Sequence, residues 1–311
     1  MPLPIIIDTD PGCDDAVAIL LALASPEFDI LGLTTVAGNV SLDKTTANAL
    51  RLVELAGRPQ VPVLAGCPRP ILRPLETAEQ VNGESGMDGA GLPPPSLAPG
   101  RGHAVGWMVA TLRAAPQPVT LVALGPLTNL ALALVQAPDI AARIARIALM
   151  GGAARVPGNT TASAEYNILV DPHAAAVVFG AGVPITMFPL DVTHKVLATP
   201  ERLARLAAAG SRAGTVAAGV LGRFSRDHVE KYGAPGSPLH DPCPLAWLIR
   251  PALFRGRDCH VAVDTHSPLN EGRTVVDWWG RGGLAPNATV MHEVDAPALF
   301  DLLADRLARL P

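Results

Sequence analysis

An apolar strand followed by four closely spaced aspartates is the strongest constraint on how this chain can fold. Residues 5–7 are three isoleucines, whose β-branched side chains favour a short buried strand. Residues 16–24 are apolar and favour a buried helix. In an open α/β sheet, ligands bind at the carboxyl ends of the strands, where such a strand passes into its helix. The acidic residues lie at that place, around a Pro-Gly turn: Asp8, Asp10, Asp14 and Asp15.

Four carboxylates this close together repel one another, and a bound cation would remove that repulsion. Ligands that are all oxygen favour a hard ion, Ca²⁺ or Mg²⁺, over zinc. Any one of the aspartates is explained equally well by a structural role, such as capping the helix or accepting a hydrogen bond in a turn. The four together favour a metal site.

Size and composition indicate a globular protein with a large core. The chain has 311 residues, of which 49% are hydrophobic and 17% charged, and we expect one domain over residues 1–311. A net charge of −4 offers no basic surface for nucleic acid. The longest apolar run, residues 16–24, is too short to cross a bilayer, and residues 1–4 lack the positive charge of a secretory signal. Because the apolar run is short, we expect no membrane binding. Four widely spaced cysteines form no CxxC pair, so we expect a reduced, cytoplasmic protein.

Strand and helix patterns alternate up to residue 189 and then pass into a helical and β-rich C-terminal extension. The alternation predicts an α/β fold with an open, mostly parallel twisted sheet, Rossmann-like, and helices on both faces. The predicted strands are residues 5–7, 30–36, 61–64, 119–124, 144–150 and 185–188, and the predicted helices are residues 16–24, 42–56, 128–136, 174–179, 200–209, 212–231 and 297–310.

Two connections are too long for ordinary turns, residues 66–102 and residues 151–167. Both follow predicted strands, so both are expected over the same edge of the sheet. We interpret the first, which is rich in Pro and Gly, as a mobile lid. Further along, His240 and Asp241 precede a Pro-initiated apolar helix, which adds an imidazole and a carboxylate at a helix start.

The polar residues at these predicted strand and loop ends are mostly carboxylates and amides, which suit a hydroxyl-rich ligand. The chain has no Walker loop, no GxGxxG and no GxSxG motif. A sugar held over a hard cation fits the set, which comprises Asp8, Asp10, Asp14, Asp15, Asn39, Asn159, Glu165, Asn167, His240 and Asp241.

Five sequence blocks, in this order, resemble the calcium-dependent nucleoside hydrolases (inosine–uridine-preferring nucleoside N-ribohydrolases). They are DTDPGCDDAVAILLAL from residue 8, AGN from residue 37, LGPLTNLALAL from residue 124, MGGAARVPGNTTASAEYN from residue 150 and LHDP from residue 239. The resemblance implies hydrolysis of the N-glycosidic bond of a ribonucleoside substrate to free base and ribose. It also implies a homodimer or homotetramer, since relatives commonly form these assemblies.

The resemblance further implies a calcium site. The side chains of Asp10, Asp15 and Asp241 and the backbone carbonyl of Leu124 match the groups that hold Ca²⁺. Asp10 also matches the general base that takes a proton from the water activated by the ion. Carboxylates beside the ribose would favour the oxocarbenium-like charge that develops there.

Other matching positions imply contacts with the sugar. Asp14 and Asn167 match the groups on the ribose 2′- and 3′-hydroxyls, and Asn159 and Glu165 match those on the 5′-hydroxyl. The remaining two matches are Asn39, beside the sugar, and Asp8, in a supporting position below the site.

The departing base needs a proton or a stabilised anion. His240 is the natural acid, because imidazole titrates near neutrality; the alternative is that it only packs beside Asp241. Many relatives carry His-Gly where this chain has Asn82 and Gly83; because an amide is no acid near pH 7, we expect Asn82 to bind the substrate without protonating it. His228 and Tyr232 lie in the region that faces the base in relatives, although His228 is equally well explained as a surface residue.

Two other functions remain open. Asp8-Thr9-Asp10 is also compatible with a Mg²⁺-dependent phosphohydrolase of the DxD type, which would need a lysine near the phosphate. Lysine is scarce, with Lys44, Lys195 and Lys231 only. A non-catalytic nucleoside- or sugar-binding protein would present the same polar groups. The sequence does not choose between a purine and a pyrimidine base.

Overall fold

The structure is a computed structural model that describes the backbone of residues 1–311 and all side chains except those of residues 224, 226–229, 231 and 232. The predicted contacts of His228 and Tyr232 with the base therefore lie outside the described residues. Within the part of the chain that is described, no helix combines the length and the apolar character that crossing a bilayer requires.

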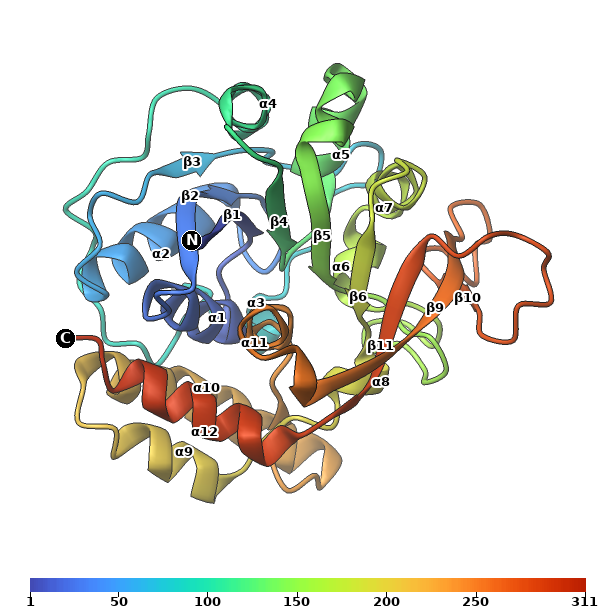
Figure 1. Cartoon of the computed structure of the whole chain (residues 1–311). Helices are drawn as coiled ribbons and strands as arrows, with labels where there is room; N and C mark the ends of the chain where they lie inside the picture. The colour runs from blue at the N-terminus through green and yellow to red at the C-terminus, as the bar shows by residue number, and fades with distance from the viewer.

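A nine-stranded sheet forms the centre of the molecule, in the order β10-β9-β11-β6-β5-β4-β1-β2-β3 (Figure 1). The strands from β11 to β3 are parallel, and β9 and β10 are antiparallel additions at one edge. The predicted fold class is confirmed. The strands are β1 Leu3–Thr9, β2 Phe28–Thr35, β3 Val63–Ala65, β4 Val119–Ala123, β5 Ile144–Met150, β6 Ile185–Phe188, β9 Phe254–Val263, β10 Thr274–Asp277 and β11 Ala288–Val294, with β7 Leu197–Ala198 and β8 Ser237–Pro238 in a separate pair.

Helices cover both faces of the sheet and enclose two apolar cores (Figure 1). Successive side chains of β1 enter different cores: Ile5 and Ile7 join one and Ile6 the other, as the alternation of a strand requires. The first core is covered by α1 Cys13–Leu23, α2 Leu42–Leu55, α10 Arg212–Tyr232, α11 Pro242–Ile249 and α12 Ala296–Leu307, and the second by α4 Ala104–Ala114, α5 Thr128–Gln136 and α7 Pro172–Phe179. The shorter helices are α3 Glu79–Asn82, α6 Tyr166–Val170, α8 Leu190–Thr193 and α9 Pro200–Ala207.

The order of the strands places a topological switch point between β1 and β4. From β1 the chain proceeds outward to β2 and β3, and it then returns to the other side of β1 as β4. Loops after β1 and β4 therefore diverge to opposite sides and open a crevice, which is where open α/β sheets bind ligands. The Asp8–Asp15 motif and Leu124 flank this point.

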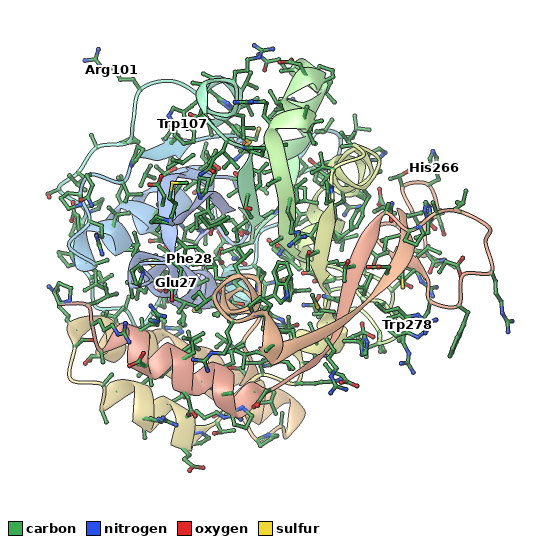
Figure 2. The ribbon with its side chains drawn as sticks, viewed as in Figure 1. Glu27, Phe28, Arg101, Trp107, His266 and Trp278 are labelled. Atoms are coloured by element: carbon green, nitrogen blue, oxygen red, sulfur yellow. The ribbon has the colours of Figure 1, made fainter. Side chains whose placement is uncertain are left out.

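Several elements differ from the sequence prediction in their bounds or were not predicted, and two of them bear on the argument. Helix α1 begins at Cys13 rather than at residue 16, so Asp14 and Asp15 lie in its first turn. Helix α4 was not predicted, because its pattern is only weakly amphipathic and follows a Pro- and Gly-rich stretch. Its Trp107, labelled in Figure 2, packs so closely on β2 that a Cβ on Gly32 would lie 2.6 Å from the indole ring.

Candidate active site

Segments from five parts of the chain meet at the carboxyl edge of the sheet. Asp10 follows β1, Asn39 follows β2, Leu124 follows β4, Gly151 follows β5, and Asp241 immediately precedes α11. Because β1, β2, β4 and β5 run parallel, their carboxyl ends share one edge. The sequence prediction that these blocks converge is borne out in their placement.

Asp10 is fully buried at the centre of this edge. Its Oδ2 accepts a hydrogen bond from the backbone N–H of Asn39 at 2.7 Å, whereas its Oδ1 is buried with no hydrogen-bond partner. A Cβ at Gly38 or Gly125 would lie 2.1 or 2.3 Å from the Asp10 carboxylate oxygens, so only glycine lets both loops approach it. The chain thus surrounds a carboxylate closely and still leaves one of its oxygens unpaired.

Three more carboxylates lie beside it. Oxygens of Asp14, Asp15 and Asp241 are all within 4.8 Å of one another, a spacing that could hold a metal ion. Asp15 is held by the hydroxyl of Thr9 and by the backbone N–H of Gly12, which donates to Oδ2 at 3.0 Å. We call Asp10, Asp14, Asp15 and Asp241 the acidic floor.

Burial raises the pKa of every member of the acidic floor, and the charges of neighbouring carboxylates raise the pKa values of Asp10, Asp14 and Asp241 further. Burial is the first cause for each member, and it raises the pKa of Asp14 to about 7, with the charge of Asp15 as the next cause. The pKa of Asp241 is raised well above its usual value by burial and then by the charges of Asp14, Asp15 and Asp10. The pKa of Asp10 is raised by burial and then by the charge of Asp15. Such a cluster favours a bound cation, because a divalent ion would offset the repulsion.

Asp8 lies below the floor and is also buried. Its Oδ1 accepts hydrogen bonds from the Thr34 hydroxyl at 2.5 Å and from the Asn129 amide at 2.8 Å, while its Oδ2 has no partner among the described atoms. Burial raises the pKa of Asp8 to about 7, against the opposing effect of those two bonds. These bonds hold Asp8 in place, and its supporting role stays a prediction.

Asn39 and Asn82 link the floor to α3. The Asn39 amide donates to Asp15 Oδ2 and to the backbone carbonyl of Asp10, both at 3.1 Å. Asn82, only 5% exposed, donates to Asn39 Oδ1 at 2.9 Å. The middle of the predicted lid is therefore hydrogen-bonded to the site; its mobility stays a prediction.

Leu124 and Asn167 meet on the other side of Asp10. The side-chain amide of Asn167 donates to the Leu124 carbonyl at 2.8 Å and to the Met150 carbonyl at 3.2 Å. The Leu124 carbonyl thus faces Asn167 and retains a second lone pair, and its role as a metal ligand stays a prediction.

Glu165 and Asn159 are placed differently. Glu165 is buried, and its carboxylate accepts backbone N–H bonds from Gly152, Asn167 and Ile168, capping α6. Burial raises its pKa, against the lowering effect of these bonds. Asn159 is exposed, and its Oδ1 accepts the backbone N–H of Tyr166 at 3.0 Å.

His240 adjoins both the floor and α8. Its backbone N–H donates to Asp14 Oδ2 at 3.3 Å, and its Nδ1 lies 2.7 Å from the hydroxyl of Thr193. The ring of His194 is tilted against it, with 5.8 Å between the centroids. The predicted leaving-group acid is therefore adjacent to the predicted ribose ligand Asp14.

Sequence reasoning missed two residues at this edge, Tyr166 and Thr193. Burial and then the charge of Asp10 raise the pKa of the Tyr166 phenol, which donates to the Glu76 carbonyl at 3.0 Å. Tyr166 could have been found as the only aromatic residue in the polar block before Asn167. Thr193, at the end of α8, has no comparable signal in the sequence.

Comparisons with known proteins agree over almost the whole chain. A family model described as inosine-uridine preferring nucleoside hydrolase matches residues 5–301. A Citrobacter koseri protein named pyrimidine-specific ribonucleoside hydrolase RihA is 49% identical over 309 residues, covering 99% of each chain. Among solved structures, a plant nucleoside hydrolase superposes with a TM-score of 0.92 at 34% identity over 99% of each chain. A purine-preferring ribonucleoside hydrolase from Gardnerella vaginalis gives 0.92 at 31% identity over 98% of each chain.

Proposed function

The chain belongs to the inosine-uridine preferring nucleoside hydrolase family, and we propose that it hydrolyses ribonucleosides to free base and ribose at the acidic floor, with calcium as its metal. The resemblance drawn from the sequence is confirmed by this membership. Family membership also favours N-glycosidic hydrolysis over the phosphohydrolase alternative. That alternative needs a lysine near the phosphate. Lys44 and Lys195 instead donate to the backbone carbonyls of Glu84 and His292.

The observation that carries the proposal is the clustering of four carboxylates at the acidic floor without a basic side chain to compensate them among the described residues. Four carboxylates share one buried edge, Asp10 Oδ1 has no partner, and no arginine or lysine is paired with Asp10, Asp14, Asp15 or Asp241 among the described side chains. Burying charge in this way is unfavourable unless a cation compensates it. An all-oxygen set of carboxylates and a carbonyl suits Ca²⁺.

Asp10, Asp15, Asp241 and the Leu124 carbonyl would hold the ion, with Asp14 adjacent. When bound, calcium would lower the pKa of a water and fix its direction of attack. Asp10 would then accept the proton from that water at its unpaired Oδ1. Asp10 is suited to this role because its other oxygen is already held by Asn39, so the carboxylate is oriented before the substrate arrives.

The ribose would lie against the amides and carboxylates around the floor. Asp14 and Asn167 would hold the 2′- and 3′-hydroxyls. Glu165 and Asn159 would hold the 5′-hydroxyl; the Glu165 carboxylate already accepts three N–H bonds, so it is rigid and has room for one further donor. Fixing three hydroxyls would orient the anomeric carbon toward the water.

His240 would protonate the departing base. Its contact with Thr193 fixes one ring nitrogen, and its backbone bond to Asp14 holds it next to the ribose position. His228 and Tyr232 are proposed to contact the base from α10. A pyrimidine base is favoured, because the relative named pyrimidine-specific is 49% identical and the one named purine-preferring is 31% identical.

The proposal also covers the domain organisation, the cellular location and the assembly of the protein. One nucleoside-hydrolase-like domain over residues 1–311 is supported by the nine-stranded sheet, whose strands span Leu3 to Val294. A cytoplasmic location is supported by four buried free cysteines. A homodimer or homotetramer is proposed from the family resemblance alone.

Base release from uridine, cytidine, inosine and adenosine, each with calcium and with a chelator, tests the proposal. We expect ribose and free base with calcium, faster with uridine and cytidine, and loss of turnover with the chelator. Tight nucleoside binding without base release over hours would favour the non-catalytic alternative. Phosphate release from monoesters would favour the phosphohydrolase.

A further inference from the structure

We propose that Asn82 is a positioning residue that caps helix α1 from outside the helix and, through Asn39, fixes the orientation of the Asp10 and Asp15 carboxylates. This role replaces the substrate contact that the sequence predicts for Asn82. It rests on the proposed calcium-dependent function. The structural basis is a pair of hydrogen-bonded side-chain amides, which connects the backbone of α1 to the acidic floor.

The first link is a helix cap supplied by a residue that lies outside the helix. Helix α1 begins after Gly12, which has no side chain to accept a bond from the first turn. The backbone N–H of Cys13, in that turn, donates instead to Asn82 Oδ1 at 3.1 Å. Asn82 is 69 residues away in sequence and thus satisfies a donor that the local sequence leaves without an acceptor.

The second link sets the donor–acceptor direction of the hydrogen bonds that the two amides make. A backbone N–H only donates, so Asn82 must present its oxygen to Cys13, and its Nδ2 then faces Asn39 Oδ1 at 2.9 Å. Asn39 must in turn present its nitrogen to the floor, where it donates to Asp15 Oδ2 at 3.1 Å. A reversed Asn39 amide would direct oxygen at carboxylate oxygen, which is repulsive.

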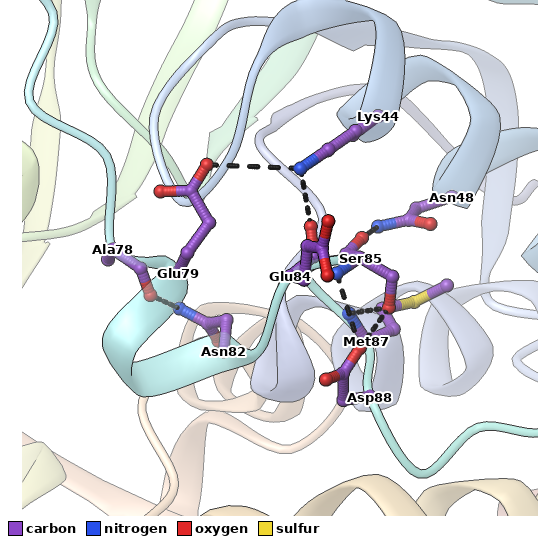
Figure 3. A network of polar contacts seen from close by, with 9 residues as sticks. All are labelled: Lys44, Asn48, Ala78, Glu79, Asn82, Glu84, Ser85, Met87 and Asp88. Atoms are coloured by element: carbon purple, nitrogen blue, oxygen red, sulfur yellow. Dashed lines mark hydrogen bonds and ion pairs between the residues drawn. The ribbon is translucent and has the colours of Figure 1, made fainter.

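Close packing holds the two amides in place. A Cβ on Gly12 would lie 2.7 Å from both Asn39 Nδ2 and Asn82 Oδ1. The backbone of α3 is also tied to Asn39, because Ala78 N–H donates to the Asn39 carbonyl at 2.9 Å. Figure 3 shows Asn82 within α3, with its amide directed back to the Ala78 carbonyl.

Helix α2 fixes the segment that follows. Asn48 donates to the carbonyls of Pro11, in the acidic motif, and Ser85, after α3, at 3.0 and 2.8 Å. Lys44 donates to the Glu84 carbonyl at 2.6 Å (Figure 3). Asn82 therefore occupies a defined position, so its amide orients Asn39 at little further cost in conformational entropy.

The chemical consequence is independent of the base. Asn39 holds one oxygen of Asp10 through its backbone N–H and one oxygen of Asp15 through its amide. Asp10 Oδ1 stays without a partner and can serve the ion or the water, while Asp15 Oδ1 accepts the Thr9 hydroxyl. Without Asn82, Asn39 can rotate and the two carboxylates lose their common orientation. Outer partners of metal ligands typically change metal affinity by about 10- to 100-fold.

The test compares Asn82→Ala, which loses both links, with Asn82→Asp, which keeps an acceptor for Cys13 but cannot donate to Asn39. Calcium affinity is measured by titration calorimetry on the metal-free protein, and kcat and KM are measured separately on uridine and inosine. We expect calcium binding to weaken about tenfold or more in both variants, and kcat to fall by the same factor on both substrates. Gln80→Ala, at an exposed position of the same helix, is the matched control and should match wild type.

A double variant tests whether Asn82 acts through Asn39. Asn39→Ala combined with Asn82→Ala should lose no more calcium affinity than Asn39→Ala alone, whereas independent sites would give additive losses. Unchanged calcium affinity in both Asn82 variants, or a loss of kcat/KM on one base only, would overturn the inference in favour of a base contact. Wild-type protein that binds no calcium or releases no base would instead overturn the proposed function. Thermal melting confirms that each variant is folded.

Discussion

The acidic floor and the corner around Glu165 both bury carboxylates at the same edge of the sheet, yet the chain treats them in opposite ways. Glu165 receives three backbone N–H bonds and caps α6, so its charge is compensated by the protein itself. Asp10 has one oxygen with no partner and three further carboxylates as neighbours. The difference teaches that the protein itself can satisfy a single buried carboxylate, whereas a cluster of buried carboxylates with no basic partner among the described side chains favours a cation.

The pKa directions support the same distinction. The pKa of Glu165 is raised by burial alone among the largest causes, and every opposing cause is a backbone hydrogen bond. The pKa of Asp241 is raised by burial and then by three neighbouring carboxylates. A cation is therefore expected to matter at the floor and to be nearly irrelevant at Glu165.

The largest effect is expected at Asp10. Asp10→Ala should reduce base release by about a thousandfold or more, because it removes the general base and a metal ligand together. The measurement is kcat on uridine at saturating calcium. Asp43→Ala, at an exposed position of α2, should keep wild-type kcat. Undiminished hydrolysis in the Asp10 variant would defeat the assignment.

Calcium should stabilise the protein through the floor and not through Glu165. At a hundred times its dissociation constant, an ion bound only by the folded state adds about 2.7 kcal/mol, which raises the melting temperature by several degrees. Asp241→Asn should abolish this shift, whereas Glu165→Gln should lower the melting temperature and keep the shift. If calcium raised the melting temperature of the two variants equally, the distinction between the acidic floor and Glu165 would be wrong.

Metal-free protein should become less stable as the pH rises toward the raised pKa values of the buried carboxylates at this edge. The pKa values of Asp8 and Asp14 are raised from 3.8 to about 7 on folding, so between these values the folded state binds more protons than the unfolded chain. The free energy of unfolding should therefore fall between about pH 4 and pH 7. Urea titrations across this range measure the slope, and saturating calcium should flatten it. A metal-free stability that rises over the same range would contradict the charge assignment.

The smallest effect is expected at Asn159. Its side chain is exposed and accepts one backbone N–H, so Asn159→Ala should change stability by less than about 0.5 kcal/mol. If it holds the 5′-hydroxyl, KM for uridine should rise by up to about tenfold, while 5′-deoxyuridine should show no difference between variant and wild type. An equal loss on both substrates would exclude a 5′-hydroxyl contact.

Much of this arrangement could be predicted from the sequence, because it depends on local pattern and strand order. Helix α5 and strands β5 and β6 have the bounds that the sequence predicts, and parallel strands bring Asp10, Asn39 and Leu124 to one edge. The start of α1 could not be predicted, because its cap is Asn82, which is distant in sequence. The contact of Thr193 with His240 likewise depends on tertiary packing and has no local signal.

A crystal structure grown with calcium tests the central claim most directly. We predict an ion bonded at about 2.3–2.6 Å to oxygens of Asp10, Asp15 and Asp241 and to the Leu124 carbonyl, with Glu165 still bound only by backbone N–H groups. A structure in saturating calcium with no ion among these oxygens, and with the floor carboxylates turned toward solvent, would contradict it.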